Sequence, residues 1–260
     1  MSNAYYPILL DLQNRSCVIV GGGRVAERKA ASLLEAGARV KLIAPEITPR
    51  LEAWVKDGTV SLRRERYRAG LPELGEARLV FAATDRSEVN EQVKHEAEQL
   101  GKLFNSADDQ NAGGFIVPAV VRRGRLTVAV STSGASPALA AALKRKLEEV
   151  FPAAYEPYVE LLNDLRMAVQ ELVPDTQTRQ EMFRGMLAWP LLAVLEPAPR
   201  EAAGLKVRLL ERLRSDPSPA EVQRAGDWLR RQLQERGSGG QDEWMEDHRS
   251  NPSDKPGNDT

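Results

Sequence analysis

The sequence contains a single cysteine, Cys17, and only two histidines, His95 and His248. One thiol cannot form a disulfide within the chain, and so few cysteine and histidine side chains do not provide the usual ligands of a zinc site. We therefore expect no metal cofactor. A lone cysteine inside an apolar stretch is typical of a small buried side chain in a reducing compartment, so we expect a cytoplasmic protein.

The chain also lacks an excess of either charge, because 36 lysines and arginines face 37 aspartates and glutamates. No overall field therefore draws it to nucleic acid or to an anionic membrane. No apolar run reaches the ~18 residues of a membrane-spanning helix. We expect neither a nucleic-acid partner nor a membrane partner. The hydrophobic content of 42% and the length of 260 residues are those of a globular protein with room for more than one domain.

A glycine cluster near the start of the chain lies between an apolar run at residues 17–20 and a stretch of helical periodicity that ends at Gly37. A second apolar run follows at residues 40–44. This order predicts a strand, a helix and a second strand, which together form a β-α-β unit.

Within this unit, Gly21, Gly23 and Ala26 have the G-x-G-x-x-G/A spacing of a dinucleotide site. Gly21 permits a tight turn, Gly23 lets the backbone approach a pyrophosphate, and Ala26 allows the helix to pack closely on the strand. The helix N-terminus offers unpaired N–H groups to the phosphates. A glycine-rich turn without a ligand is the alternative. The residues that we expect to contact the cofactor here are Gly21, Gly22, Gly23, Arg24 and Val25.

The pattern of alternating strands and helices continues to about residue 114, and it predicts a Rossmann-like, doubly wound parallel α/β sheet. The strands are expected at residues 6–12, 17–20, 40–44, 59–63, 79–83 and 102–105. Polar segments that follow these strands are candidates for a ligand site, because ligands of such sheets bind at the carboxyl ends of the strands. These candidates for cofactor contact are Ala44, Pro45, Glu46, Thr84, Asp85 and Asn105.

Glu46 lies about where an acidic residue would bind the ribose hydroxyls of the cofactor, although it can equally be a solvated turn residue. No arginine directly follows the second strand to hold a 2′-phosphate, which favours NAD over NADP. Asp108 and Asp109 lie in a loop after a strand, where a carboxylate can accept a proton from a substrate. The alternative for this pair is an Asp-rich turn.

Beyond residue 114 the pattern changes to two β runs at residues 115–121 and 126–131, which predict an antiparallel hairpin. Ser136 and Pro137 then have the residue types of an N-cap and a first helical position. We divide the chain into a nucleotide-binding domain at 1–114, a small β/α region at 115–150, a helical domain at 151–236 and a disordered tail at 237–260. Breaks within the helical domain are expected near Pro174, Pro190, Pro197 and Pro217.

Basic residues gather on the predicted hairpin turn and on the helix after it, namely Arg122, Arg123, Arg125, Lys144, Arg145 and Lys146. They form either a solvated face or a site for a polyanionic ligand, since arginine pairs well with carboxylates. No aromatic residues are interleaved with them, as they are in sites that bind single-stranded nucleic acid.

Four segments together carry a family resemblance: residues 18–29, 81–85, 105–108 and 128–137. With these motifs the chain resembles the precorrin-2 dehydrogenase family, the dehydrogenase–ferrochelatase module of siroheme synthase, over residues 5–190. The resemblance implies NAD-dependent oxidation of precorrin-2 to sirohydrochlorin, a homodimer formed by the region after the Rossmann domain, and in some members the insertion of ferrous iron.

The resemblance also implies roles for individual residues. The proposed catalytic aspartate of the family falls at Asp108, and substrate contacts fall at Thr132, Ser133 and Ser136. Because precorrin-2 is a polycarboxylate, it is a ligand for Arg122, Arg123, Arg125 and Lys144. A different class of function also fits the glycine loop, namely a regulatory protein that binds NAD(H), senses redox state and performs no chemistry.

Overall fold

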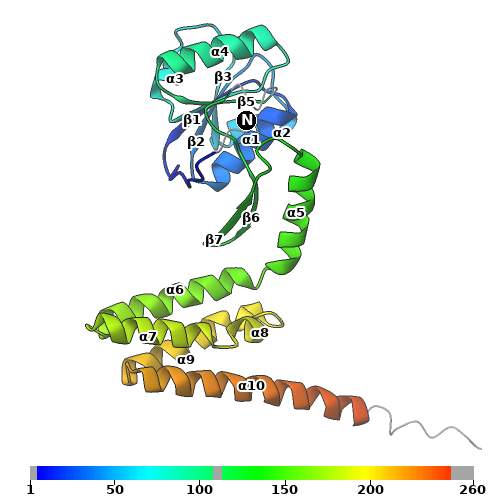
Figure 1. Ribbon diagram of the computed structural model, residues 1–260. Helices are drawn as coiled ribbons and strands as arrows, with labels where there is room; N and C mark the ends of the chain where they lie inside the picture. The colour runs from blue at the N-terminus through cyan, green and yellow to red at the C-terminus, as the bar shows by residue number, and fades with distance from the viewer. Residues whose placement is uncertain (1–4, 108–112, 247–260) are drawn as a thin grey trace, which may run out of the picture. The chain divides into compact units, whose positions relative to one another are not determined.

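The computed structural model describes residues 5–107 and 113–246, with side chains up to Arg236. The chain forms two compact units (Figure 1). The first contains the residues up to Pro118 together with Ser131–Leu139, and the second contains Ala119–Val130 and the residues from Ala140 onward.

The first unit is built on a five-stranded parallel sheet in the order β3-β2-β1-β4-β5. Its strands are β1 (Ser16–Val20), β2 (Arg39–Ile43), β3 (Val60–Arg63), β4 (Leu79–Ala82) and β5 (Leu103–Ser106). After β3 the chain returns to the other side of β1, so the strand order reverses between β1 and β4. Such a reversal opens a crevice at the carboxyl ends of these two strands. The predicted doubly wound α/β sheet is therefore confirmed.

Helices cover both faces of this sheet, because alternate residues of each buried strand point to opposite faces. The helices are α1 (Arg24–Glu35), α2 (Pro49–Lys56), α3 (Pro72–Glu76) and α4 (Ser87–Gln99). Ile19 and Phe81 pack on the face covered by α1 and α2, whereas Val18 and Val80 pack on the face covered by α3 and α4 (Figure 1). The sheet thus has an apolar core on each side, and polar chemistry is left to its edges.

The prediction of a strand at residues 6–12 is wrong, because this segment has no regular secondary structure. Tyr6 is 87% exposed and Leu9 is 80% exposed, and only Leu12 is buried against the α1 face. An apolar run becomes a strand only where a neighbouring strand accepts its backbone hydrogen bonds, and this segment takes no place in the sheet.

The second unit begins with the predicted antiparallel hairpin, formed by β6 (Ala119–Arg123) and β7 (Leu126–Val130). The helix α5 (Pro137–Val150) follows a serine N-cap, as predicted, since the N–H of Leu139 donates to Oγ of Ser136 at 3.2 Å. None of the residues of α5 is buried.

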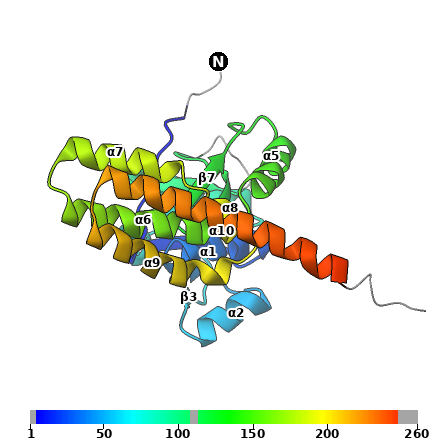
Figure 2. The same ribbon diagram turned by 90° about the horizontal axis from the view of Figure 1, so that it is seen from below.

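The rest of the second unit is a helical bundle, and its breaks fall near the four predicted prolines. Its elements are α6 (Tyr155–Leu172), α7 (Thr176–Leu187), α8 (Leu191–Leu195), a 3₁₀ turn (Pro199–Glu201), α9 (Ala202–Ser215) and α10 (Pro219–Glu246). The helices α6, α7, α9 and α10 lie side by side (Figure 2). They enclose a core that includes Leu165, Met182, Leu209 and Leu229.

The helix α10 extends to Glu246, past Arg236, where we expected it to end. The predicted start of the disordered tail at Gly237 is therefore too early, because residues 237–246 belong to α10. The rest of the predicted tail, residues 247–260, lies outside the described chain. Each residue added to an existing helix gains one hydrogen bond without a new nucleus, so a glycine-containing segment can continue a long helix. In the part of the chain that the structure describes, no helix has both the length and the apolarity needed to span a bilayer.

Candidate functional site

The first two glycines of the loop after β1 are fixed by neighbouring loops. Gly21 has φ +125°, and its N–H donates to the carbonyl oxygen of Ile43 at 3.0 Å. A Cβ at Gly21 would lie 2.2 Å from the carbonyl oxygen of Ala83, and one at Gly22 would lie 2.0 Å from that of Glu46. The loops after β1, β2 and β4 therefore pack backbone to backbone, and only glycine fits at these two positions.

Gly23 is different, because a Cβ built there meets no described atom within 4 Å. Gly23 is the N-cap of α1, and no side chain of the described residues caps this end of the helix. The N–H groups of the first turn of α1 therefore have no side-chain cap from the described residues, at the positive end of the helix dipole. An uncapped helix N-terminus with open space beside Gly23 suits the pyrophosphate of a dinucleotide, and the contact itself stays a prediction.

Glu46 lies beside this loop, and its exposed carboxylate remains available for the ribose hydroxyls. Ala44 is buried and Pro45 is exposed at the same end of β2. Arg63 was not among the predicted site residues; it ends β3 and is aligned with Ile43 of β2. Only the register of the sheet reveals that an arginine is next to the end of the second strand.

Two carboxylates engage the guanidinium of Arg63. Its Nε lies 2.6 Å from Oε1 of Glu73, and its Nη1 lies 3.1 Å from Oε1 of Glu65. Glu73 is buried and also lies 3.9 Å from the ammonium of Lys41. An arginine held in this way is already neutralised by its neighbours, so it offers little to a 2′-phosphate.

The turn after β4 is held by Thr84 and the buried Asn90. The Thr84 hydroxyl donates to Oδ1 of Asn90 at 2.7 Å, and Nδ2 of Asn90 donates to the Thr84 carbonyl oxygen at 3.1 Å. The hydroxyl also accepts from the N–H of Arg86 at 3.2 Å. Thr84 therefore shapes the turn with its side chain, and Asp85 is left exposed at the ligand edge.

Asn105 is only 5% exposed, and both ends of its amide are engaged. Its Oδ1 accepts from Nζ of Lys29 at 3.1 Å, and its Nδ2 donates to the carbonyl oxygen of Phe115 at 3.0 Å. Burial lowers the pKa of the Lys29 ammonium, and the nearby Arg28 lowers it further. A cofactor contact of Asn105 would therefore use its backbone, because its side chain already has partners. Lys29 was not among the predicted site residues.

Asp108 and Asp109 lie outside the described residues. The chain on either side of them is anchored at the ligand edge of the sheet. The N–H of Ala107 donates to the carbonyl oxygen of Ala82 at 2.9 Å, and that of Gly114 donates to the carbonyl oxygen of Phe104 at 2.9 Å.

The predicted substrate contacts near residue 132 form a tight turn in the first unit. The Thr132 hydroxyl accepts from the N–H of Ser136 at 3.0 Å and donates to the Ser136 carbonyl oxygen at 3.1 Å. Ser133 has φ +51°, and the Ser136 hydroxyl caps α5. The Thr132 hydroxyl therefore stabilises the turn, and the Ser136 hydroxyl caps the helix.

The basic residues that we predicted to bind the substrate all belong to the second unit. The glycine loop belongs to the first unit. Nε of Arg123 donates to the carbonyl oxygen of Phe151 at 2.8 Å. Arg125 pairs with Glu160 at 3.0 Å, and Lys144 pairs with Glu148 at 3.5 Å. Arg122 is exposed and forms no ion pair with the described residues. Among these four residues, Arg122 is therefore the side chain most available to an anionic ligand.

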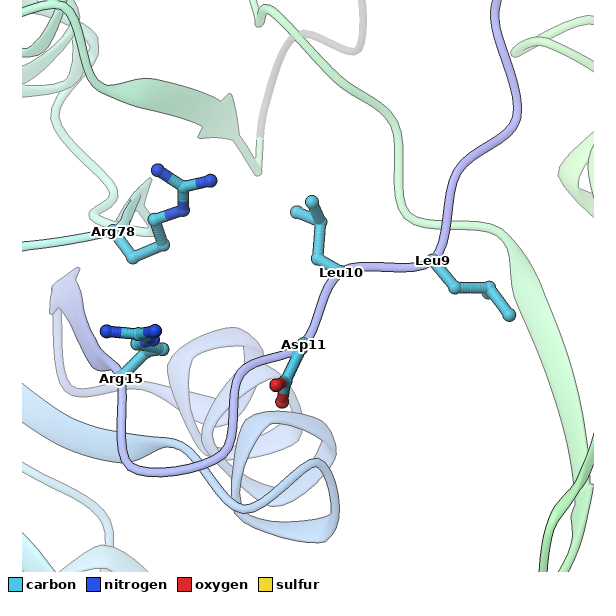
Figure 3. A pocket seen from close by; sticks show the side chains of 5 residues that line it. All are labelled: Leu9, Leu10, Asp11, Arg15 and Arg78. Atoms are coloured by element: carbon cyan, nitrogen blue, oxygen red, sulfur yellow. The ribbon is translucent and has the colours of Figure 1, made fainter.

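A cavity of about 400 Å³ lies at the opposite edge of the same sheet (Figure 3). Arg15 and Arg78, which line it, directly precede β1 and β4, so they mark the amino ends of these strands (Figure 3). Leu9, Leu10 and Asp11 complete its lining. The cavity is thus separate from the carboxyl edge that carries the glycine loop. Over residues 5–107 and 113–236, no three His, Cys, Asp or Glu side chains are grouped to hold a metal ion.

The comparisons with known proteins agree with this geometry. Residues 8–119 match an NAD(P)-binding family, and residues 123–149 match the family described as sirohaem biosynthesis protein central. A siroheme synthase of Chromobacterium violaceum is 39% identical over 187 residues, which are 72% of this chain and 39% of that protein. One of Nitrosococcus oceani is 36% identical over 211 residues, which are 80% of this chain and 44% of that protein.

Among solved structures, the precorrin-2 dehydrogenase SirC superposes with a TM-score of 0.64 at 27% identity, over 78% of this chain and 100% of that one. The chain is therefore similar to a precorrin-2 dehydrogenase, and it matches an NAD(P)-binding family and a sirohaem biosynthesis family. The NAD(P)-binding match covers most of the first unit, including the loop that contains Gly23. The chain spans about two fifths of the length of the siroheme synthases that it matches.

Proposed function

We propose that the protein oxidises precorrin-2 to sirohydrochlorin with NAD as the hydride acceptor. The observation that carries this proposal is the uncapped N-terminus of α1 behind Gly23, at the carboxyl edge of the sheet, in a chain similar to a precorrin-2 dehydrogenase. The likeness to SirC over the whole length of that dehydrogenase supports the same reaction.

In this proposal NAD supplies hydride acceptance, and the chain binds and orients it. The N–H groups of the first turn of α1, at Arg24 and Val25, bind the pyrophosphate, while Gly21 and Gly22 hold the loop in place. Glu46 accepts hydrogen bonds from the ribose hydroxyls. Because Glu65 and Glu73 already occupy Arg63, the protein prefers NAD to NADP.

Asp108 is our proposed proton acceptor. As a hydride leaves one carbon of the substrate for NAD, a proton leaves as well, and the Asp108 carboxylate takes it and passes it to water. This role is supported by the family resemblance and by the place of Asp108 in the chain, shortly after β5 ends at the ligand edge. We further propose that Thr132, Ser133, Ser136, Arg122, Arg123, Arg125 and Lys144 contribute to binding the substrate and its carboxylates.

We also propose a homodimer. Leu139 and Val150 of α5 are 51% and 60% exposed, and Val121 is the one buried residue among the described strands of the hairpin. A two-stranded hairpin is marginally stable by itself in water, and an apolar helix face needs a cover. A second copy of the chain provides that cover.

Ferrous iron insertion into sirohydrochlorin is the second activity that we propose, because the curated relatives are siroheme synthases and siroheme contains iron. Iron is then a substrate of the protein. The cytoplasmic location inferred from the lone Cys17 stays a prediction.

The test of the proposed function mixes the protein with NAD and precorrin-2 under anaerobic conditions and records NADH formation. Asp108→Asn keeps the size of the side chain and removes the base, so turnover should fall at least about 100-fold. Its affinity for NAD, measured by calorimetry, should not change. Asp109→Asn is the matched control and should retain turnover.

Two outcomes would contradict the proposal at different points. If Asp108→Asn turns over like the unmodified protein, Asp108 has no part in the reaction. If the unmodified protein binds NAD but forms no NADH from precorrin-2, the redox-sensing function without catalysis replaces the enzyme.

A further inference from the structure

Lys29 is a lysine of α1 that points into the first unit instead of into solvent. Its Nζ lies 3.1 Å from Oδ1 of Asn105 and 5.3 Å from the centroid of the Phe81 ring. Among the described residues, no carboxylate forms an ion pair with it. A partly buried ammonium without a carboxylate partner is costly, so this arrangement calls for an explanation beyond solubility.

Asn105 connects this ammonium to a second part of the chain. Its Nδ2 donates to the carbonyl oxygen of Phe115 at 3.0 Å, and the Phe115 ring packs edge-on against Phe81 with centroids 5.6 Å apart. The side chain of Asn105 thus connects the end of β5 to the chain segment that returns to the sheet at Phe115.

The backbone at this link is tightly packed. The N–H of Gly114 donates to the carbonyl oxygen of Phe104 at 2.9 Å. A Cβ at Gly113 would lie 2.8 Å from that same oxygen and 3.1 Å from Cα of Asn105. A small displacement of Asn105 would therefore also displace residues 113–115.

The ammonium decides which way the Asn105 amide faces. An amide has an acceptor at one end and donors at the other, and it can flip. Lys29 only donates, so it holds Oδ1 toward itself and leaves Nδ2 for Phe115. A carboxylate at position 105 would pair more strongly with Lys29, but it could not donate to Phe115. The neutral amide is thus the side chain that satisfies both neighbours.

We propose that Lys29 is a positioning residue of the dehydrogenation: by orienting the Asn105 amide, it holds Phe115 against the end of β5. In the sequence, Asp108 lies between the end of β5 and Phe115. The catalytic part of this inference rests on the proposed function, whereas the orienting part concerns described residues alone. Lys29 touches neither cofactor nor substrate in this account.

The test replaces Lys29 with methionine, which keeps the apolar stem and removes the ammonium. Hydrogen exchange at the backbone N–H of Gly114 should become about tenfold faster, because the side-chain amide of Asn105 loses the Lys29 ammonium that fixes its orientation. The kcat of NADH formation should fall at least about tenfold, while KM for NAD should stay within about twofold. Lys29→Arg, which keeps a cation, should recover part of both losses.

Two further variants separate orientation from charge and from folding. Asn105→Asp keeps an acceptor for Lys29 but cannot donate to Phe115, so it should also speed exchange at Gly114. Lys94→Met is the matched control, because Lys94 is a partly buried lysine of α4 in the same unit, and it forms an ion pair with Glu91 at 3.8 Å. It should leave exchange at Gly114 and kcat unchanged.

Unchanged exchange at Gly114 in Lys29→Met would overturn the inference, whatever the activity. Faster exchange with an unchanged kcat would overturn the catalytic part. Absence of NADH formation by the unmodified protein would instead reject the proposed function and with it the catalytic part, while exchange would still decide the orienting part.

Discussion

The carbonyl oxygen of Ala83 lies where a side chain on Gly21 would begin, since a Cβ at Gly21 would be 2.2 Å from it. At Gly23, two residues later, a Cβ would meet no described atom within 4 Å. The two glycines of one fingerprint therefore serve different purposes. Gly21 lets two loops of the protein pack, and Gly23 leaves open space at the N-terminus of α1.

Substitutions at these glycines should have separate effects. Gly23→Asp should fold normally and bind NAD at least about tenfold more weakly, because it adds a side chain and a negative charge where the pyrophosphate binds. Gly21→Ala should instead lower the melting temperature. Calorimetry with NAD and thermal denaturation measure the two effects.

Gly58→Ala is the control for backbone strain, because Gly58 also has a positive φ, +79°, but has no described atom near its Cβ position. It should cost about 1–2 kcal/mol from the left-handed conformation alone. Gly21→Ala should cost more. Equal losses of stability would show that the contact with Ala83 is unimportant.

The exposed face of α5 should be the interface between two copies. Leu139→Lys places a charge on this face and should convert a dimer to a monomer, or weaken it at least about tenfold, in sedimentation experiments. Leu187→Lys is the control, because Leu187 of α7 is 64% exposed and lies outside α5 and the hairpin. A Leu139→Lys protein that sediments like the unmodified dimer would place the interface elsewhere.

Neighbouring arginines of the hairpin should behave differently. Arg123→Gln removes the donor to the Phe151 carbonyl oxygen and should reduce the free energy of unfolding by about 1–3 kcal/mol. Arg122→Gln should leave stability unchanged and raise KM for precorrin-2, because Arg122 is exposed and forms no ion pair with the described residues. An unchanged KM in Arg122→Gln would make this residue part of a solvated face.

Cys17 should be inert in the folded protein. It is fully buried in β1, and burial raises the pKa of its thiol to about 11. The thiolate is the reactive form, so a raised pKa leaves less of it at pH 8, and burial blocks access as well. Iodoacetamide should label Cys17 only after denaturant is added. Rapid labelling of the native protein would show that the β1 region opens.

The alternation of strands and helices was readable from the sequence because buried strands, helical spacings and prolines are local signals. The runs at residues 17–20 and 79–83 became the neighbouring central strands β1 and β4. The segment at residues 6–12 has the same apolar character but no place in the sheet, and no local signal reports on pairing.

Lys29 and Arg63 were missed for a related reason. In the sequence Lys29 follows Arg28 and looks like part of a solvated helix face. Its role appears only when β5 places Asn105 beside Phe81, and that of Arg63 only when β3 places it beside Ile43. Contacts of this kind depend on sheet register, which residue types alone do not specify.

The most direct test of the central claim is the stoichiometry of the reaction with NAD and precorrin-2, followed anaerobically by absorbance of both products. We expect one NADH for each sirohydrochlorin formed, faster turnover with NAD than with NADP, and a kcat/KM for NAD that is at least about tenfold lower in Gly23→Asp. Sirohydrochlorin formed without NADH, or NADH formation that Gly23→Asp leaves intact, would contradict the claim.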